Sequence, residues 1–220
     1  MERHFDREFE GLKKQILVMG NHVQQAISLA MRGLTERELK YLDQVHEIEK
    51  EINQLHLEVD SNCIRILAKQ SPLGANLRMV FSVVKINADL ERMGDQAVNI
   101  AHNGKQYLQR PAFKPLIDLP QMGEEVKLMV REALEAFVNL DVTLAEKVLR
   151  YDDVVDDLKK KILTDVVHLM KQDSSILDEA LNLIFIARNL ERLGDHATNI
   201  AEEAIFDANG TDVRHKREKS

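Results

Sequence analysis

The segment Leu90–Ala101, LERMGDQAVNIA, recurs as Leu190–Ala201, LERLGDHATNIA. Over positions 86–101 and 186–201, ten of the sixteen residues are identical. The identities include polar residues that helix packing alone does not require, namely Glu91/Glu191, Arg92/Arg192, Asp95/Asp195 and Asn99/Asn199. We therefore interpret the repeat as a site that is built twice, and not only as a duplicated scaffold.

Apolar residues around both copies follow helical spacing. In the first copy, steps of four and three residues separate Met79, Val83, Ile86, Leu90, Met93, Ala97 and Ile100. Segments 5–30, 119–140 and 183–200 show the same spacing, which is typical of long amphipathic helices, and no segment alternates with the period of a strand. The spacing predicts an all-α protein with six long helices, arranged as two tandem, internally repeated three-helix bundles.

Helix-start and helix-stop signals divide the chain. We predict a first repeat over 1–104, a linker over 105–117 that contains Pro111 and Pro115, a second repeat over 118–209 and a flexible tail over 210–220. Four polar pairs predict helix starts, namely Thr35 with Glu38, Ser71 with Pro72, Thr143 with Glu146, and Ser175 with Asp178. Asn209-Gly210 predicts the end of the last helix.

Composition limits the class of protein. The 220 residues carry a net charge of −7 and one cysteine, Cys63. The charged N-terminal segment does not resemble a secretory signal, and no apolar run approaches the roughly 20 residues of a membrane helix. We expect a cytoplasmic protein that does not bind nucleic acid as a default partner.

Carboxylates in the repeated segment are spaced as neighbours on one helix. Glu91 and Asp95 are four residues apart and repel by about 0.2–0.5 kcal/mol, so helix stability gives no reason to place them there. If the preceding helix forms an antiparallel hairpin with theirs, Glu49 faces Asp95 and Asn53 faces Glu91.

The second repeat predicts the same arrangement. There Asp152 faces Asp195, and Asp156 faces Glu191. Eight candidate metal ligands result, namely Glu49, Asn53, Glu91, Asp95, Asp152, Asp156, Glu191 and Asp195. Their oxygen atoms suit a divalent or trivalent cation better than a structural zinc site, which usually uses Cys or His. A solvated acidic face is the alternative interpretation.

The two dodecamers, the AKQSP stretch Ala68–Pro72 and the three-helix duplication resemble the PhoU family over essentially the whole chain. The family signature, ExxxD or DxxxD in paired helices, is matched at Glu91/Asp95, Asp152/Asp156 and Glu191/Asp195. Asn53 departs from the signature because an acid would complete the motif that begins at Glu49. This departure predicts weaker metal binding in the first repeat.

The resemblance implies a negative regulator of phosphate uptake and of the phosphate-starvation response. Its implied partners are the phosphate transporter ATPase and a sensor histidine kinase, so that the protein is peripheral to membrane complexes. Its implied metals are iron or zinc, with magnesium, manganese or calcium as further options, and a homodimer is expected. Three alternatives stay open. They are a metal-storage protein or carboxylate-metal enzyme, a helical scaffold whose acidic residues are only solvated surface residues, and an accessory protein of another phosphate permease.

Other patterns predict no site. Asp43-x-x-His46 and Asp165-x-x-His168 do not correspond within the repeat, and Cys63 has the context of a small packed residue. No Glu-x-x-His pair and no Gly-rich phosphate loop occurs. We therefore expect neither a di-iron oxygenase nor a nucleotide hydrolase, and no enzymatic activity.

Overall fold

The structure, a computed structural model, describes residues 2–213 and contains six long helices. They are α1 (Glu2–Glu36), α2 (Leu39–Gln70), α3 (Ala75–Tyr107), α4 (Asp118–Asn139), α5 (Val142–Gln172) and α6 (Leu177–Asn209), with a short 3₁₀ turn, η1 (Ser174–Ile176), before α6. No strand occurs within the described residues. The prediction of an all-α, repeated helical architecture is confirmed.

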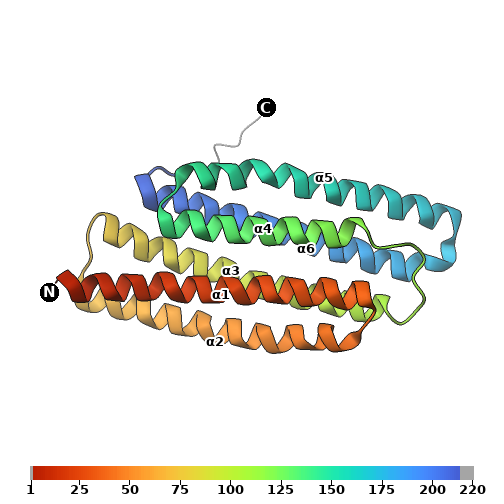
Figure 1. The fold of residues 1–220 in the computed structure, drawn as a ribbon, viewed down its shortest axis with the longest axis horizontal. Coiled ribbons are helices and arrows are strands. Elements are labelled where there is room, and N and C mark those ends of the chain that lie inside the picture. Colours follow the sequence, from red (N-terminus) through yellow and green to blue (C-terminus); the bar gives the residue numbers. More distant parts are fainter. Residues whose placement is uncertain (1, 214–220) are drawn as a thin grey trace.

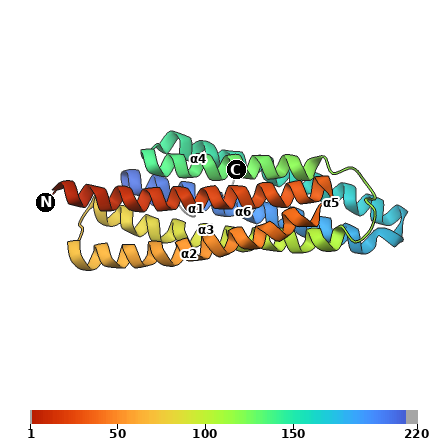
Figure 2. The same cartoon turned by 60° about the horizontal axis from the view of Figure 1, so that its bottom comes forward.

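The two three-helix units lie side by side and are offset along their long axes. Helices α1–α3 form one unit and α4–α6 the other, with α3 and α6 adjacent and running in opposite directions (Figures 1 and 2). Buried apolar residues from all six helices form one continuous core. The repeats therefore share a core across the α3–α6 and α1–α4 contacts and are not two separate bundles.

Close approach of the units depends on a small residue in α1. A Cβ at Gly20 would lie 2.0 Å from Cδ1 of Leu134 in α4, which is well inside van der Waals contact. Gly20 thus lets the leucine of the second unit pack directly against the α1 backbone. An alanine at this position would push the two units apart or force Leu134 out of its rotamer.

The predicted apolar stripes are the buried faces of the helices. In α3, Val83, Ile86, Leu90, Met93, Ala97 and Ile100 are completely buried, and Met79 is 7 % exposed. Burial of each large side chain contributes about 1.5–3 kcal/mol, which explains why these stripes decide the fold.

Two predicted helix starts in the first unit are wrong. Thr35 belongs to the last turn of α1, where its Oγ1 donates to the Met31 carbonyl at 2.8 Å, and α2 begins after Glu38 without a side-chain cap. Ser71 has a left-handed backbone (φ 45°) and ends α2, and α3 begins only at Ala75. Thr35 and Ser71 therefore belong to the C-terminal ends of α1 and α2, and not to the starts of the helices that follow.

The helix starts in the second unit are also shifted. Asp141, and not Thr143, precedes α5, and its Oδ1 accepts from the Leu144 amide at 3.0 Å. Asp173 accepts from the Ser175 amide at 2.9 Å, so Ser175 lies in η1 and α6 starts at Leu177. In each case an aspartate two residues earlier takes the N-cap role, and aspartate is favoured there over threonine and about as much as serine. The end of α6 at Asn209, with left-handed Gly210 after it, is confirmed.

The connection between the units is shorter than the predicted linker. Helix α3 continues to Tyr107, so residues 108–117 join it to α4. Residues 214–220 of the predicted tail lie outside the described residues. Within residues 2–213, no helix has the length and apolarity needed to cross a bilayer.

Candidate functional site

The acids of the second repeat gather where α5 and α6 pack together. Asp152 and Asp156 come from α5, and Glu191 and Asp195 from α6. The pKa of the Asp195 carboxyl is raised, first by its partial withdrawal from water and then by the negative charges of Glu191, Asp152 and Asp156. The four carboxylates therefore lie close enough to act on one another, as the hairpin register predicts. We call these four residues the second cluster.

A lysine that sequence analysis missed lies beside the second cluster. Lys159 Nζ contacts Glu191 Oε1 at 2.5 Å, with the lysine side chain one-third exposed. Lys159 follows Asp156 by three residues and so lies on the same side of α5. The three-residue spacing from Asp156 could have identified Lys159 from the sequence. The ammonium group of Lys159 offsets one negative charge of the cluster.

We call the corresponding residues of the first repeat, Glu49 and Asn53 of α2 and Glu91 and Asp95 of α3, the first cluster. Asn53 Nδ2 donates to Glu49 Oε1 at 2.5 Å, so the amide that replaces an acid hydrogen-bonds to its neighbour on the same helix. A nitrogen donor thus binds one carboxylate in each cluster.

Glycines set the same helix register behind both clusters. A Cβ at Gly94 would lie 3.3 Å from Ile52, and a Cβ at Gly194 would lie 3.5 Å from Val155 and 3.7 Å from Asp152 Oδ1. Ile52 and Val155 precede Asn53 and Asp156 by one residue. The glycines therefore occupy equivalent places behind the two clusters, but only at Gly94 is the facing helix too close for a Cβ to fit without movement.

The eight candidate ligands lie at the molecular surface. Asp95 and Asp195 are exposed, and the other six are half-buried. No group of three or more His, Cys, Asp or Glu side chains is arranged to hold a metal ion anywhere in residues 7–213. The donor chemistry of the second cluster nevertheless fits a hard cation, because Asp195 lies among three other carboxylates. Metal binding there requires Lys159 to leave Glu191 and the carboxylates to converge.

A buried polar contact between the repeats was also missed by sequence analysis. His196 Nδ1 lies 2.8 Å from Asp89 Oδ1, which also accepts from Asn199 Nδ2 at 3.2 Å. One turn away, Lys85 Nζ lies 2.8 Å from Glu203 Oε1, and the Glu203 side chain is 4 % exposed. These residues link α3 to α6, a contact that a helical wheel drawn for one unit does not include.

The residues that sequence analysis set aside have structural partners. Asp43 pairs with Lys105 at 2.7 Å, and His168 Nε2 contacts Gln172 at 2.9 Å. Cys63 is buried, which raises its pKa to about 12. A thiol in this state is not a nucleophile at neutral pH.

A duplicated all-helical fold with one ExxxD-type cluster in each repeat defines the class of this protein. A family model described as the PhoU domain matches residues 16–103 and again residues 119–204. The chain belongs to the PhoU family.

Relatives and solved structures agree with this assignment over nearly the whole chain. The chain is 37 % identical to a phosphate-specific transport system accessory protein PhoU homolog of Pseudomonas aeruginosa, covering 98 % of this chain and 89 % of the relative. It is 31 % identical to the PhoU accessory protein of Escherichia coli, covering 96 % and 88 %. The crystal structure of PhoU from P. aeruginosa superimposes with a TM-score of 0.89, with 36 % identity and coverage of 94 % and 100 %. PhoU from Streptococcus pneumoniae gives 0.86, with 28 % identity and coverage of 95 % and 99 %.

Proposed function

We propose that this protein is a cytoplasmic accessory regulator of a phosphate-specific transport system and represses the phosphate-starvation response when phosphate is abundant. The observation that carries the proposal is similarity over 98 % of the chain to a relative with that accessory role in its name. The transporter ATPase and a sensor histidine kinase are the proposed partners. Regulation proceeds by protein contact, without catalysis and without DNA binding.

The shape and charge of the molecule support regulation through contact. Six helices of 22 to 35 residues lie side by side and present long outer faces, which suit docking of a partner helix or domain. The net charge of −7 disfavours the phosphate backbone of DNA. A homodimer is part of the proposal, to be measured by light scattering.

We further propose that the clusters bind divalent or trivalent cations and that metal occupancy influences partner binding. Support comes from the duplication of the acids at one hairpin register and from the mutual repulsion at Asp195. A bound cation would neutralise that repulsion and hold α5 against α6, or α2 against α3. Iron and zinc are the first metals to test, followed by manganese, magnesium and calcium.

The decisive experiment deletes the gene and measures a phosphate-starvation reporter in phosphate-replete medium. We expect the reporter to be active without the protein and silent when the wild type is restored. The double variant Asp152→Asn/Asp195→Asn tests the second cluster, and Asp178→Asn, an exposed acid in the first turn of α6, is the matched control.

Partner capture separates regulation by contact from the alternatives. Tagged protein from phosphate-replete cells should retain the transporter ATPase and the sensor kinase. Retention of neither partner, together with salt-resistant and sequence-specific promoter binding, would contradict the proposal. Turnover of a substrate by the metal-loaded protein would instead support the carboxylate-metal enzyme.

A further inference from the structure

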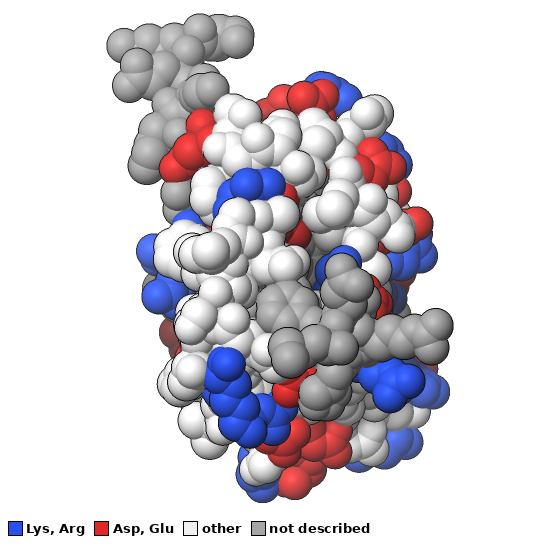
Figure 3. All heavy atoms as spheres, turned by 90° about the vertical axis from the view of Figure 1, so that its left-hand side faces the viewer, with Lys and Arg blue, Asp and Glu red and all other residues white. Residues whose placement is uncertain are grey.

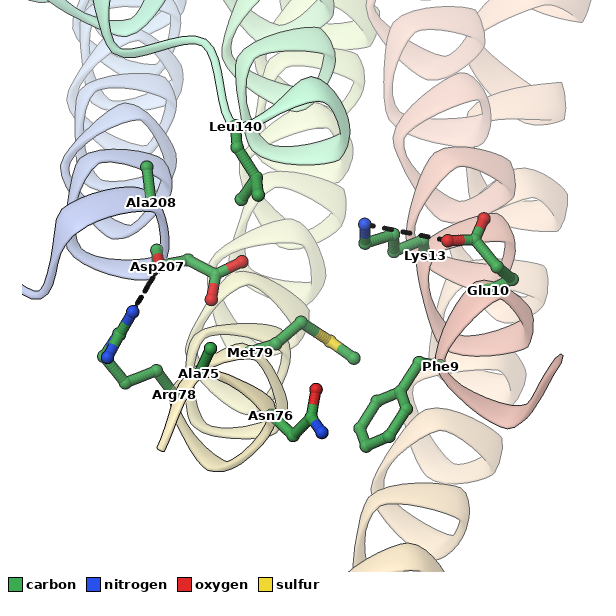
Figure 4. A pocket seen from close by; sticks show the side chains of 10 residues that line it. All are labelled: Phe9, Glu10, Lys13, Ala75, Asn76, Arg78, Met79, Leu140, Asp207 and Ala208. Carbon is green, nitrogen blue, oxygen red and sulfur yellow. Dashed lines mark hydrogen bonds and ion pairs between the residues drawn. The ribbon is translucent and has the colours of Figure 1, made fainter. Parts of the chain in front are cut away.

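A cavity of about 330 Å³ opens at one end of the molecule, between the second and third turns of α1, the start of α3 and the last turn of α6, beside Leu140 at the end of α4. Figure 3 shows this end, on which basic and acidic side chains are interspersed and neither sign forms a continuous patch. Lys13, Asn76, Arg78 and Asp207 are among the polar residues that line the cavity (Figure 4). None of the eight predicted metal ligands contributes to it.

Asp207 is a buried acid that points into this cavity. The residue is only 5 % exposed, and its carboxyl group is turned toward the cavity (Figure 4). In the described part of the chain its carboxyl oxygens have neither a hydrogen bond nor an ion pair. Burial raises its pKa to about 6, Lys13 and Arg78 lower it, and Glu203 raises it. A buried carboxyl in this position is an acceptor without a protein donor.

The two nearby cations are held by backbone carbonyls and do not pair with this acid. Lys13 Nζ donates to the Val138 carbonyl at 3.4 Å and lies 3.8 Å from Glu10. Arg78 Nε and Nη2 donate to the main-chain carbonyl of Asp207 at 3.4 and 3.3 Å. Figure 4 shows the Lys13 ammonium and the Asp207 carboxyl on different sides of the cavity. A ligand between them needs an acceptor for the lysine and a donor for the acid.

The start of α3 borders the same cavity. Ala75 and Asn76 line it, and Gly74 at the N-cap gives the helix no side-chain cap. The first amides of a 33-residue helix are thus free to donate, and the helix dipole favours an anion there. Glu10 and Glu203 oppose this preference, but Glu10 is exposed and Glu203 is paired with Lys85.

We propose that this cavity binds a phosphate group that still carries a proton. Its oxygens accept from Lys13, from the α3 amides and from Arg78, and its P–OH donates to the Asp207 carboxylate. Sulfate has no proton at neutral pH, so it meets an acceptor where it needs a donor. The site therefore selects phosphate over sulfate, a property that depends on neither the metal clusters nor the proposed protein partners.

Calorimetric titration of the full chain tests the site, in a buffer without phosphate or sulfate and at constant ionic strength. At about pH 7.5 we expect inorganic phosphate to bind at least about tenfold more tightly than sulfate, the effect of one charged hydrogen bond. Titration with glycerol phosphate distinguishes a free phosphate from an esterified one. At this pH the ester has lost its second proton and has no P–OH, so it should bind about as weakly as sulfate. Tighter binding of the ester than of inorganic phosphate would overturn the proposed contact with Asp207.

Single substitutions distinguish phosphate binding at this cavity from nonspecific attraction of anions to surface lysines. Lys13→Gln should weaken phosphate binding about tenfold, and so should Arg78→Gln, whereas Lys14→Gln, an exposed lysine on the same helix, should not. Asp207→Asn supplies an amide donor in place of the acid, so sulfate should then bind about as tightly as phosphate. Asp178→Asn is the matched control and should keep the discrimination.

The pH dependence gives a second readout. Sulfate binding to the wild type should strengthen as the pH falls through about 6, because Asp207 then becomes a donor, with Lys13, Arg78, Glu10 and Glu203 as the charged groups around it. Asp207→Asn should not show this change. Equal affinities for phosphate and sulfate in the wild type would overturn the proposal, as would Lys13→Gln and Arg78→Gln variants that bind phosphate like Lys14→Gln.

Discussion

The two acidic clusters share a helix register but differ in how their charge is balanced. Where the second cluster has Asp156, the first has Asn53, and where the second has Lys159 one turn later, the first has His56. The second cluster therefore has one more carboxylate and one more ammonium, so the two carry the same formal charge. His56 lies 3.6 Å from Asp60 and Lys159 lies 2.5 Å from Glu191, so only the lysine pairs within its cluster.

This comparison changes what the carboxylate count alone predicts. Three acids against four predict tighter metal binding in the second repeat, but Lys159 is a resident cation that a metal must displace from Glu191. In the first cluster the donor on Glu49 is a neutral amide, and its loss costs less. The difference in metal affinity between the repeats therefore depends on one lysine as well as on one aspartate.

The largest expected effect concerns the apolar residues behind the clusters. Ile52 and Val155 are completely or almost completely buried at equivalent positions. Ile52→Ala should lower the free energy of unfolding by about 2–5 kcal/mol, and Val155→Ala by about 0.8 kcal/mol less, because one methylene fewer is removed. Urea denaturation measures both values. Because the repeats share one core, we expect a single transition, and two separate transitions would contradict that.

The contrast between fold and helix boundaries shows what the sequence could predict. The stripe from Val83 to Ile100 predicts its helix and its buried face correctly, because many residues contribute to one period. A helix start depends on one or two polar residues, and Asp141 competes with Thr143 for the same role. Since a whole N-cap contributes only about 1 kcal/mol and the preferred residues differ by less, the sequence alone does not rank them.

The candidate site also has features that the sequence could predict and features that it could not. The register of the α5–α6 hairpin follows from helix geometry, so the gathering of acids around Asp195 was predictable. The contact of Lys159 with Glu191 depends on the reach of a flexible side chain, which a wheel does not give. The Asp89–His196 contact requires knowledge of how the two units dock, and no pattern within one unit contains that information.

Removal of Lys159 sharpens the comparison most directly. Lys159→Gln should raise the metal affinity of the second cluster by about tenfold, since a competing charge leaves Glu191. His56→Gln, the equivalent change in the first repeat, should alter metal affinity far less. Calorimetry with each metal, checked by elemental analysis, gives both numbers. Equal responses of the two variants would show that Lys159 does not compete with metal.

The next effect is smaller and depends on pH. Because the folded pKa of Asp195 is raised above 3.8, its ionised form disfavours the fold, and stability falls as pH rises through that raised value. Asp195→Asn should therefore be more stable than the wild type at neutral pH, by less than about 1 kcal/mol since the site is exposed and screened. This gain in stability should vanish when the pH is below the ordinary pKa of an aspartate, because the wild-type carboxyl is then protonated.

The equivalent change in the first repeat is the control for this effect. Asp95 belongs to a cluster with one carboxylate fewer, so Asp95→Asn should give a smaller gain at neutral pH. Urea denaturation of both variants across the acidic and neutral range measures the difference. A gain for Asp195→Asn that persists unchanged in acid would point to a cause other than charge.

The smallest expected effect compares the two glycines. Alanine in a helix is favoured over glycine by about 0.5–1 kcal/mol. At Gly194 the new Cβ would meet Val155 at 3.5 Å and Asp152 at 3.7 Å, which are ordinary contacts, so Gly194→Ala should stabilise the fold by about that amount. At Gly94 two Ile52 atoms would lie at 3.3 Å and must move, which cancels part or all of the gain. Thermal denaturation of both variants measures the difference in stability. An equal gain at both positions would mean that Ile52 moves without a cost in free energy, and that both hairpins accept a Cβ behind their acidic residues equally well.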